Sequence, residues 1–248
     1  MSSVLTFRLY APLAAMGGVA VGEQRNGWMR PGRSALLGLI GACLGLDRAD
    51  DERQAALASG YRVGMLVLSS GPTLIDYHTA QMPPAKRGVR YGTRAQELAA
   101  KHELNTVLTR RAYRPDLLAL IGVAALESAW WPLCAIADAM RAPSFTPYLG
   151  RKSCPLGLPL APRITETRTI ASALAHRAAD PCETKLHDRL VSPRRLGGPL
   201  LAVPPEDLQG AAVLRTERRR DWPRSRRRWQ FELRSEAVLA WPPEEPCS

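Results

Sequence analysis

The sequence predicts an α+β protein, and three observations indicate this class. Strand-like and helix-like patterns alternate along the first 160 residues, so the two kinds of element are expected to share one domain. The chain has 248 residues, of which 46% are hydrophobic, which is enough to bury a substantial core. Lys and Arg number 34 against 23 acids, giving a formal net charge of +11. An anionic polymer is therefore the first partner to consider, with nucleic acid ahead of a membrane.

The N-terminal segment predicts a strand, a basic loop and a helix. Residues 4–10 alternate, which predicts a strand with Leu5, Phe7 and Leu9 facing the core. Residues 17–33 are rich in glycine and arginine and are predicted to be an irregular segment able to lie along a polyanion. Its candidate contacts are Arg25, Arg30 and Arg33.

The helix is predicted over residues 35–46, with Ser34 as its N-cap. Its first N–H groups and positive dipole end would then point toward the anion, so Ser34 joins the candidate site. Gly38 lies on a stripe of small residues where a sheet is expected to approach the helix closely.

Two further strands and an arm are expected next. Residues 62–68 and 73–79 flank a Ser-Ser-Gly-Pro turn and are predicted to pair as a hairpin. Residues 80–94 lack apolar periodicity and are basic, which predicts a projecting, partly mobile arm. The candidate site residues here are Tyr77, His78 and Thr79, followed on the arm by Lys86, Arg87 and Arg90.

The chain returns from the arm over residues 104–113, which bring Arg110, Arg111 and Tyr113. Residues 116–126 are apolar enough for a buried central strand. A helix is predicted over 130–141. Its candidate core residues are Trp131, Cys134, Ile136 and Met140.

The segment 148–156 predicts an anion-binding loop. Two adjacent cations follow Gly150, and a glycine can adopt positive φ, so that backbone N–H groups approach a phosphate. The alternative is a solvated surface turn. Residues 144–147 lack the glycine that a Walker-type phosphate loop needs, so an ATPase is excluded. The candidate residues of the loop are Tyr148, Gly150, Arg151, Lys152 and Ser153.

The C-terminal third predicts an irregular extension. Residues 155–162 indicate a strand edge or linker, and residues 169–179 a short helix. Residues 215–228 contain eight arginines, with two tryptophans at or beside the run. Alternation at 230–233 predicts a closing strand, which places the arginine run within the fold and not in a disordered tail.

The order of these elements suits a ferredoxin-like sheet of the RNA-recognition type, whose open face takes single-stranded RNA. We therefore predict a palm over residues 1–160 with a thumb-like insertion at about 80–108. Residues 161–248 would form the extension that returns the closing strand to the palm.

The sequence does not indicate a membrane span, a metal site or a disulfide framework. The longest apolar run is too short to span a bilayer, and the N-terminus lacks a signal-peptide core, so we expect a cytoplasmic location. The five cysteines form no Cys-x-x-Cys pair, and the four histidines show no ligand spacing. No metal or other cofactor is predicted.

Four motifs occur in order: 33–39, 76–79, 109–113 and 148–156. With them the sequence resembles the repeat-associated RNA-binding family of CRISPR proteins, among them the subunit that caps the 5′ handle of the guide RNA in the type I-E Cascade complex. The resemblance covers residues 4–160 well and beyond them rests on an Arg-Arg-Trp strand. The sequence departs from the family at Met16, where tryptophan is common, and at Gly32, where threonine is usual.

The resemblance implies a non-catalytic RNA-binding subunit of a ribonucleoprotein complex in antiviral defence. The implied partners are the CRISPR RNA 5′ handle, the Cascade backbone subunits and large subunit, and target DNA near the protospacer-adjacent motif. By this resemblance, the residues that match the family's motifs are expected to contact RNA, and Lys86, Arg87 and Arg90 lie where the family's thumb is expected. Tyrosines interleaved with cations agree with this, because single-stranded RNA is held by phosphate contacts and stacked bases.

Two other functions remain open from the sequence. Related CRISPR subunits cut repeat RNA without a metal, and His78 would then act as general base on a 2′-hydroxyl. No second histidine lies near His78, so no catalytic residue is predicted. A general DNA-binding protein is less well supported, because helix-turn-helix and zinc patterns are absent from the sequence.

Overall fold

The computed structural model describes residues 2–20, 22–190, 199–208 and 212–241. The strands are β1 (Ser2–Ala14), β2 (Gln24–Arg25), β3 (Tyr61–Ser69), β4 (Leu74–Met82), β5 (Asn105–Ala125), β6 (Arg163–Thr167), β7 (Leu200–Val203), β8 (Val213–Ser225) and β9 (Gln230–Leu239). The helices are α1 (Arg33–Cys43), α2 (Asp51–Ser59), α3 (Arg94–Glu97), α4 (Leu133–Arg141), α5 (Ile170–Ala178) and α6 (Pro181–Leu190), with 3-10 turns at Lys101–Glu103 and Pro205–Asp207.

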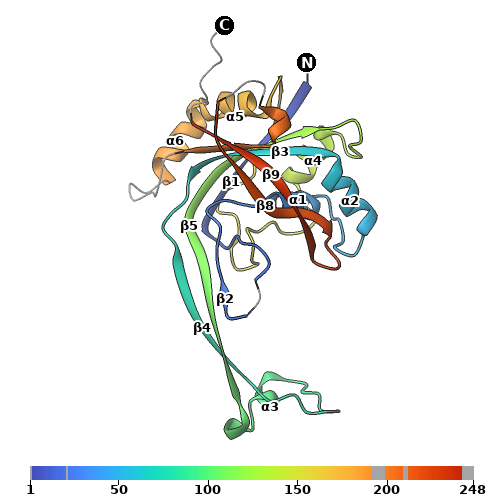
Figure 1. Cartoon of the computed structure of the whole chain (residues 1–248), viewed down its shortest axis with the longest axis vertical. Helices are drawn as coiled ribbons and strands as arrows, with labels where there is room; N and C mark the ends of the chain where they lie inside the picture. Colours follow the sequence, from blue (N-terminus) through green and yellow to red (C-terminus); the bar gives the residue numbers. More distant parts are fainter. Residues whose placement is uncertain (1, 21, 191–198, 209–211, 242–248) are drawn as a thin grey trace.

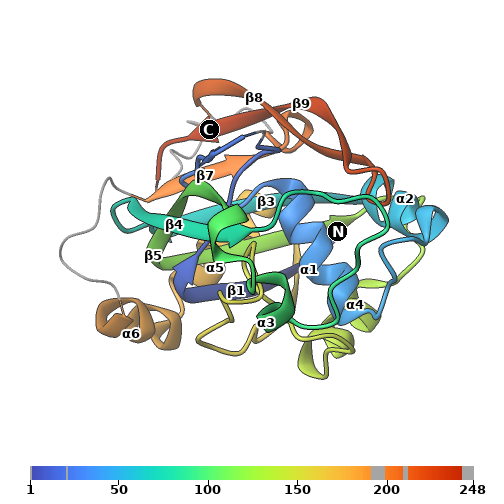
Figure 2. The ribbon, with the colours of Figure 1, turned by 90° about the horizontal axis from the view of Figure 1, so that it is seen from below.

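The body of the molecule is a sheet with helices on both faces (Figure 1). Within the described residues its strand order is β6-β1-β5-β3-β7-β9-β8, and every neighbouring pair is antiparallel. Helices α1 and α4 pack over one face, and α5 covers the other. Seen from below, the β8–β9 hairpin lies along one side of the body, with α1 between it and α4 (Figure 2).

The first predicted strand is confirmed as part of β1. Leu5, Phe7 and Leu9 are fully buried in the main core, as their alternation predicts. Thr6, on the other face, is also buried, and Arg177 of α5 donates to both its hydroxyl oxygen and its backbone carbonyl. Both faces of β1 are therefore covered around Thr6, so this part of the sheet has no open face.

The predicted hairpin between the second and third strands is wrong. Strand β3 pairs with β5 and β7, whereas β4 pairs with the outer half of β5. The reason is the length of β5, whose 21 residues run without interruption from the arm into the core. The arm projects from the body as predicted, as a long two-stranded ribbon that carries α3 near its tip (Figure 1). Its mobility stays a prediction.

The predicted ends of two helices need correction. Helix α1 begins at Arg33, so its N-cap is Gly32, and the prediction of Ser34 as N-cap is wrong. Helix α4 begins only after Pro132. Ile136 and Met140 are buried as predicted and Trp131 packs against the core, whereas Cys134 is exposed.

The C-terminal third is more regular than the sequence predicts. The expected short helix is confirmed as α5, and Thr169 caps it by accepting a hydrogen bond from the Ser172 N–H. The arginine run forms most of β8, and the closing strand is confirmed as β9, which pairs with β7 and β8. Strands β6 and β7 carried too little pattern to be predicted.

The cysteines, the possible metal ligands and the lengths of the helices bear on the disulfide, metal and membrane classes that the sequence does not support. Cys43, Cys134, Cys154 and Cys182 are free thiols, and Cys247 lies outside the described residues. In the part of the chain that the structure describes, no cluster of His, Cys, Asp or Glu side chains is placed to hold a metal ion. No helix among these residues has the length and apolar character of a membrane span.

Candidate nucleic-acid interface

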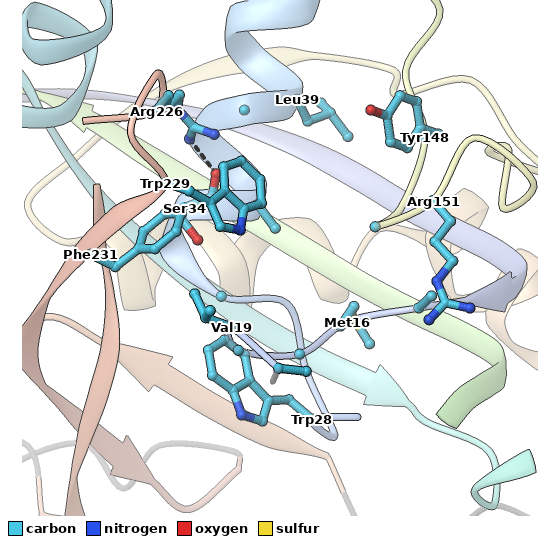
Figure 3. Close-up of a pocket in the computed structure, with 18 of the residues that line it drawn as sticks. Met16, Val19, Trp28, Ser34, Leu39, Tyr148, Arg151, Arg226, Trp229 and Phe231 are labelled. Carbon is cyan, nitrogen blue, oxygen red and sulfur yellow. Dashed lines mark hydrogen bonds between the residues drawn. The ribbon is translucent and has the colours of Figure 1, made fainter. Parts of the chain in front are cut away.

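A cavity of about 610 Å³ lies where the basic loop, α1, the 148–153 loop and the turn between β8 and β9 meet (Figure 3). Its lining is basic and, among the described residues, contains no aspartate or glutamate. The five arginines of the lining are Arg25, Arg48, Arg151, Arg220 and Arg226, and its aromatic residues are Trp28, Tyr148, Trp229 and Phe231. The cavity therefore attracts anions and offers flat rings to a base.

The 148–153 loop is held against the end of β1. The Leu149 N–H donates to the Cys154 carbonyl at 2.9 Å, and the Leu149 carbonyl accepts from the Ala15 N–H at 3.1 Å. Gly150 has φ of +85°, and a Cβ at this position would lie 1.5 Å from the Ala15 carbonyl oxygen. Only glycine fits there, for both reasons. The loop is thus a rigid wall of the cavity.

Arg151 is oriented by Tyr113. Arg151 Nη1 donates to the Tyr113 hydroxyl oxygen at 2.5 Å, and its guanidinium carbon lies 4.9 Å from the Tyr113 ring centroid. Tyr113 is buried, so its role is to position the arginine. Tyr148 is 40% exposed and borders the cavity, whereas Lys152 and Ser153 are exposed beyond its lining.

The predicted arginines of the first loop have different environments. Arg25 is exposed, lines the cavity and belongs to β2, which pairs in parallel with residues 110–111 of β5. Arg30 is 7% exposed, and its Nε donates to the Glu236 carboxylate at 3.1 Å. Its Nη2 donates to Glu217 at 2.8 Å. Arg30 therefore binds protein carboxylates, and we leave it out of the interface proposed below.

Arg33 is also turned inward. It is 4% exposed and donates to the carbonyls of Ala58 and Tyr61 at 2.6 and 2.8 Å. Its guanidinium carbon lies 4.0 Å from the Trp222 ring centroid, and burial lowers the pKa of Arg33 to about 10. It anchors α1 to β8 and does not reach the cavity. Ser34 does line the cavity, and its carbonyl accepts from Arg226.

The remaining predicted residues lie on the arm. Tyr77, His78 and Thr79 are exposed on β4, and the Arg110 guanidinium carbon lies 6.0 Å from the Tyr77 ring centroid. Arg111 is half-buried beside Arg25. The tip of the arm carries three exposed cations, Lys86, Arg87 and Arg90, of which Lys86 is paired with Glu103. None of these arm residues lines the cavity.

Several lining residues were missed by sequence reasoning: Trp28, Arg48, Arg220, Arg226, Trp229 and Phe231. A signal was present for two of them, because Arg226 and Trp229 repeat the interleaving of cation and aromatic used to select the tyrosine motifs. Arg48 gave no signal, since its neighbours in sequence are acidic.

Comparison with known proteins places the chain in a family. A model of the family described as "CRISPR-associated protein (Cas_Cas5)" matches residues 4–235. The chain belongs to the Cas5 family of CRISPR-associated proteins. The CRISPR system Cascade subunit CasD of Escherichia coli (strain K12) is 34% identical over 168 residues, covering 64% of this chain and 70% of that protein. The CRISPR resemblance seen in the four sequence motifs is thereby confirmed.

Two solved structures share the fold of this chain. A chain from a structure titled "CRISPR RNA-guided surveillance complex" has a TM-score of 0.56 and 21% identity, covering 95% of this chain and 88% of that one. A chain titled "Crystal structure of Cas protein" has a TM-score of 0.55 and 24% identity, covering 95% of this chain and 94% of that one. The shared fold therefore extends over the C-terminal third, where sequence motifs are few.

Proposed function

We propose that this Cas5-family protein is a non-catalytic RNA-binding subunit of a Cascade complex and holds the 5′ handle of the CRISPR RNA in its cavity. The observation that carries the proposal is the cavity lining, with five arginines, four aromatic residues and no acid among the described residues. Cations along the backbone and rings beneath unpaired bases are how proteins hold single-stranded RNA. The name of the CasD relative, a Cascade subunit, supports the same assignment.

We also propose that β6, β1, β5 and β3 form a ferredoxin-like palm. Supporting this, they are antiparallel neighbours in that order, and α1 and α4 lie in the two connections that the split βαβ motif requires. The β4–β5 ribbon is then the thumb-like insertion, and the later strands are the extension added to the β3 edge. Strand β6 lies just beyond the predicted boundary at residue 160.

The arm is the proposed contact with a neighbouring Cascade backbone subunit. Ile75, Tyr77 and Val107 are exposed on this ribbon, away from the helices that cover the body (Figure 1). Exposed apolar side chains gathered on one element are typical of protein interaction surfaces. Contacts with the large subunit and with target DNA near the protospacer-adjacent motif are proposed from the family resemblance.

Changing Arg151 and Lys152 together to alanine tests the RNA-binding function. Because both cations are assigned to phosphates, we expect weaker binding of single-stranded repeat RNA and a log–log salt slope that is lower by about 1.4, or about 0.7 per contact. Tyr148→Ala should instead cost about 1–3 kcal/mol of binding free energy with little change of slope, since stacking carries no phosphate contact. Fluorescence anisotropy across a salt series measures both quantities.

A matched control is available on α6, which lies on the opposite side of the body from the β8–β9 turn (Figures 1 and 2). Lys185 and Arg189 are exposed there, and changing both to alanine removes the same charge. That variant should bind like the parent. If the Arg151 and Lys152 variant also keeps the parental affinity and slope while remaining folded, the loop is a surface turn and the proposal fails.

His78→Ala tests the non-catalytic assignment. His78 is exposed on β4 opposite Thr109 and lies outside the cavity, so we expect no effect on RNA cleavage. Repeat RNA is incubated with the parent and the variant, and new RNA ends are resolved on a denaturing gel. Cleavage by the parent that disappears in the variant would identify a ribonuclease.

A further inference from the structure

The arginine run at 215–228 leads into the turn between β8 and β9, and that turn forms the cavity wall across from Tyr148 and Arg151 (Figure 3). We propose that this turn is a subsite for one unpaired nucleotide, in which Trp229 stacks on the base and Arg226 binds the adjacent phosphate. The proposal rests on the RNA-binding function proposed above and adds a second contact surface to it.

Within the described residues, no acidic side chain neutralises the charge of Arg226. Its Nη2 donates to the Ser34 carbonyl, and no aspartate or glutamate lines the cavity beside it in the described part of the chain. Burial, followed by the nearby charge of Arg48, lowers the pKa of Arg226 to about 10, so it is still protonated at neutral pH. A partly buried cation without a counter-ion is costly, and a phosphate at the cavity wall would compensate it.

Gly38 makes room for this arginine. A Cβ at position 38 would lie 3.0 Å from Arg226 Nη1, so the guanidinium packs against the glycine more closely than a side chain there would normally allow. The predicted close approach at Gly38 is therefore made by the tip of an arginine and not by a sheet. The arginine is held against α1 at a fixed place on the wall.

Trp229 lines the cavity from a backbone conformation that is unfavourable for a bulky residue. Its φ is +57°, a value at which a bulky residue is an outlier and where hairpin turns favour glycine or asparagine. Its ring is nevertheless supported on two sides. The Arg48 guanidinium carbon lies 4.3 Å from the ring centroid, and Phe231 packs edge-on at 5.4 Å between centroids.

Half of Trp229 remains exposed despite these contacts. An aromatic ring backed by a cation, with exposed surface on a cavity wall, is suited to stacking a nucleobase. Arg226 and Trp229 stand on the same four-residue turn, which matches the closeness of a phosphate and a base within one nucleotide. Because a paired base has its faces covered by its neighbours in the helix, the subsite requires single-stranded RNA.

Four variants test this subsite by anisotropy with single-stranded repeat RNA. Trp229→Ala should weaken binding about 5- to 150-fold with an unchanged salt slope, and Trp229→Phe should retain most of the affinity. Arg226→Ala should lower the slope by about 0.7. Gly38→Ala should displace the guanidinium and weaken binding without unfolding the protein, because alanine favours a helix more than glycine does.

Arg227→Ala is the matched control, because Arg227 is an exposed neighbour in the same turn that does not line the cavity. It should bind like the parent. If Trp229→Ala and Gly38→Ala also bind like the parent while the Arg151 and Lys152 variant loses affinity, the subsite is wrong and the RNA-binding function stands. If all of these variants bind like the parent, both proposals fail. If Trp229→Ala weakened the binding of fully duplex RNA as much as that of single-stranded RNA, the stacking role would also be wrong.

Discussion

Gly150→Ala is expected to abolish binding of single-stranded repeat RNA in the cavity. The new Cβ would lie 1.5 Å from the Ala15 carbonyl oxygen, so the loop must separate from the end of β1. The hydrogen bond from the Ala15 N–H to the Leu149 carbonyl would be lost with it. Tyr148 and Arg151 lie within two residues of the glycine and would leave their places on the wall, so stacking and phosphate contacts should fail together.

A second glycine variant separates the steric clash at position 150 from the cost of placing alanine at a positive φ. Gly88, on the arm, has a similar φ of +80°, but a Cβ added there would meet no heavy atom within 4 Å beyond its chain neighbours. Gly88→Ala should therefore cost only the roughly 1–2 kcal/mol of a left-handed residue, confined to the arm tip. Thermal unfolding and RNA affinity are compared for the two variants. Equal, small effects on both quantities would show that the loop moves freely and does not form a rigid wall.

The elements that the sequence predicted correctly are those whose pattern is local. Leu5, Phe7 and Leu9 alternate within one strand that has a core on that face, and the 170–178 helix has a threonine cap beside its apolar positions. Strand β5 could not be recognised as one element, because its residues are mostly exposed up to Arg110 and buried from Leu117. In the sequence, a strand whose residues change from exposed to buried halfway along resembles two separate segments.

The candidate site was predicted where its geometry is local and missed where it depends on distant partners. Gly150 and the two cations that follow it are adjacent in the sequence, so the loop could be recognised there, although Ala15 and Tyr113, which fix it in the fold, could not. Arg30 looked available for an anion only because Glu217 and Glu236, which neutralise it, belong to strands near the other end of the chain. Arg226 is the opposite case, because only the folded structure shows that no acidic side chain of the described residues pairs with it.

The largest expected loss of stability comes from Glu236→Ala. Glu236 is 1% exposed, and its carboxylate contacts three arginines: Arg30, Arg219 and Arg234. Removing one member of a buried ion network leaves charges uncompensated, which typically costs about 3–5 kcal/mol. For a chain of this size, each kcal/mol lowers the melting temperature by about 2–4 °C. Urea unfolding measures the free energy, and differential scanning calorimetry the melting temperature.

The same variant should weaken RNA binding in the fraction that stays folded. Arg219 contacts the Arg30 carbonyl, and its guanidinium carbon lies 4.4 Å from the ring centroid of Trp28, which lines the cavity. Losing Glu236 therefore loosens the attachment of the basic loop to β8 and β9.

Glu232→Ala is the control for Glu236→Ala. Glu232 lies on the same strand, but its pair with Arg224 spans 3.5 Å between two largely exposed side chains. Exposed pairs contribute about 0–1 kcal/mol, so this variant should unfold and bind RNA nearly like the parent. If the two glutamate variants lose the same small amount of stability, the buried network does not hold the loop. Glu236 contacts Arg219, and Arg219 packs on Trp28 in the cavity lining. A Glu236→Ala protein that stays stable and binds RNA with full affinity would therefore show that this network does not position the RNA-binding residues.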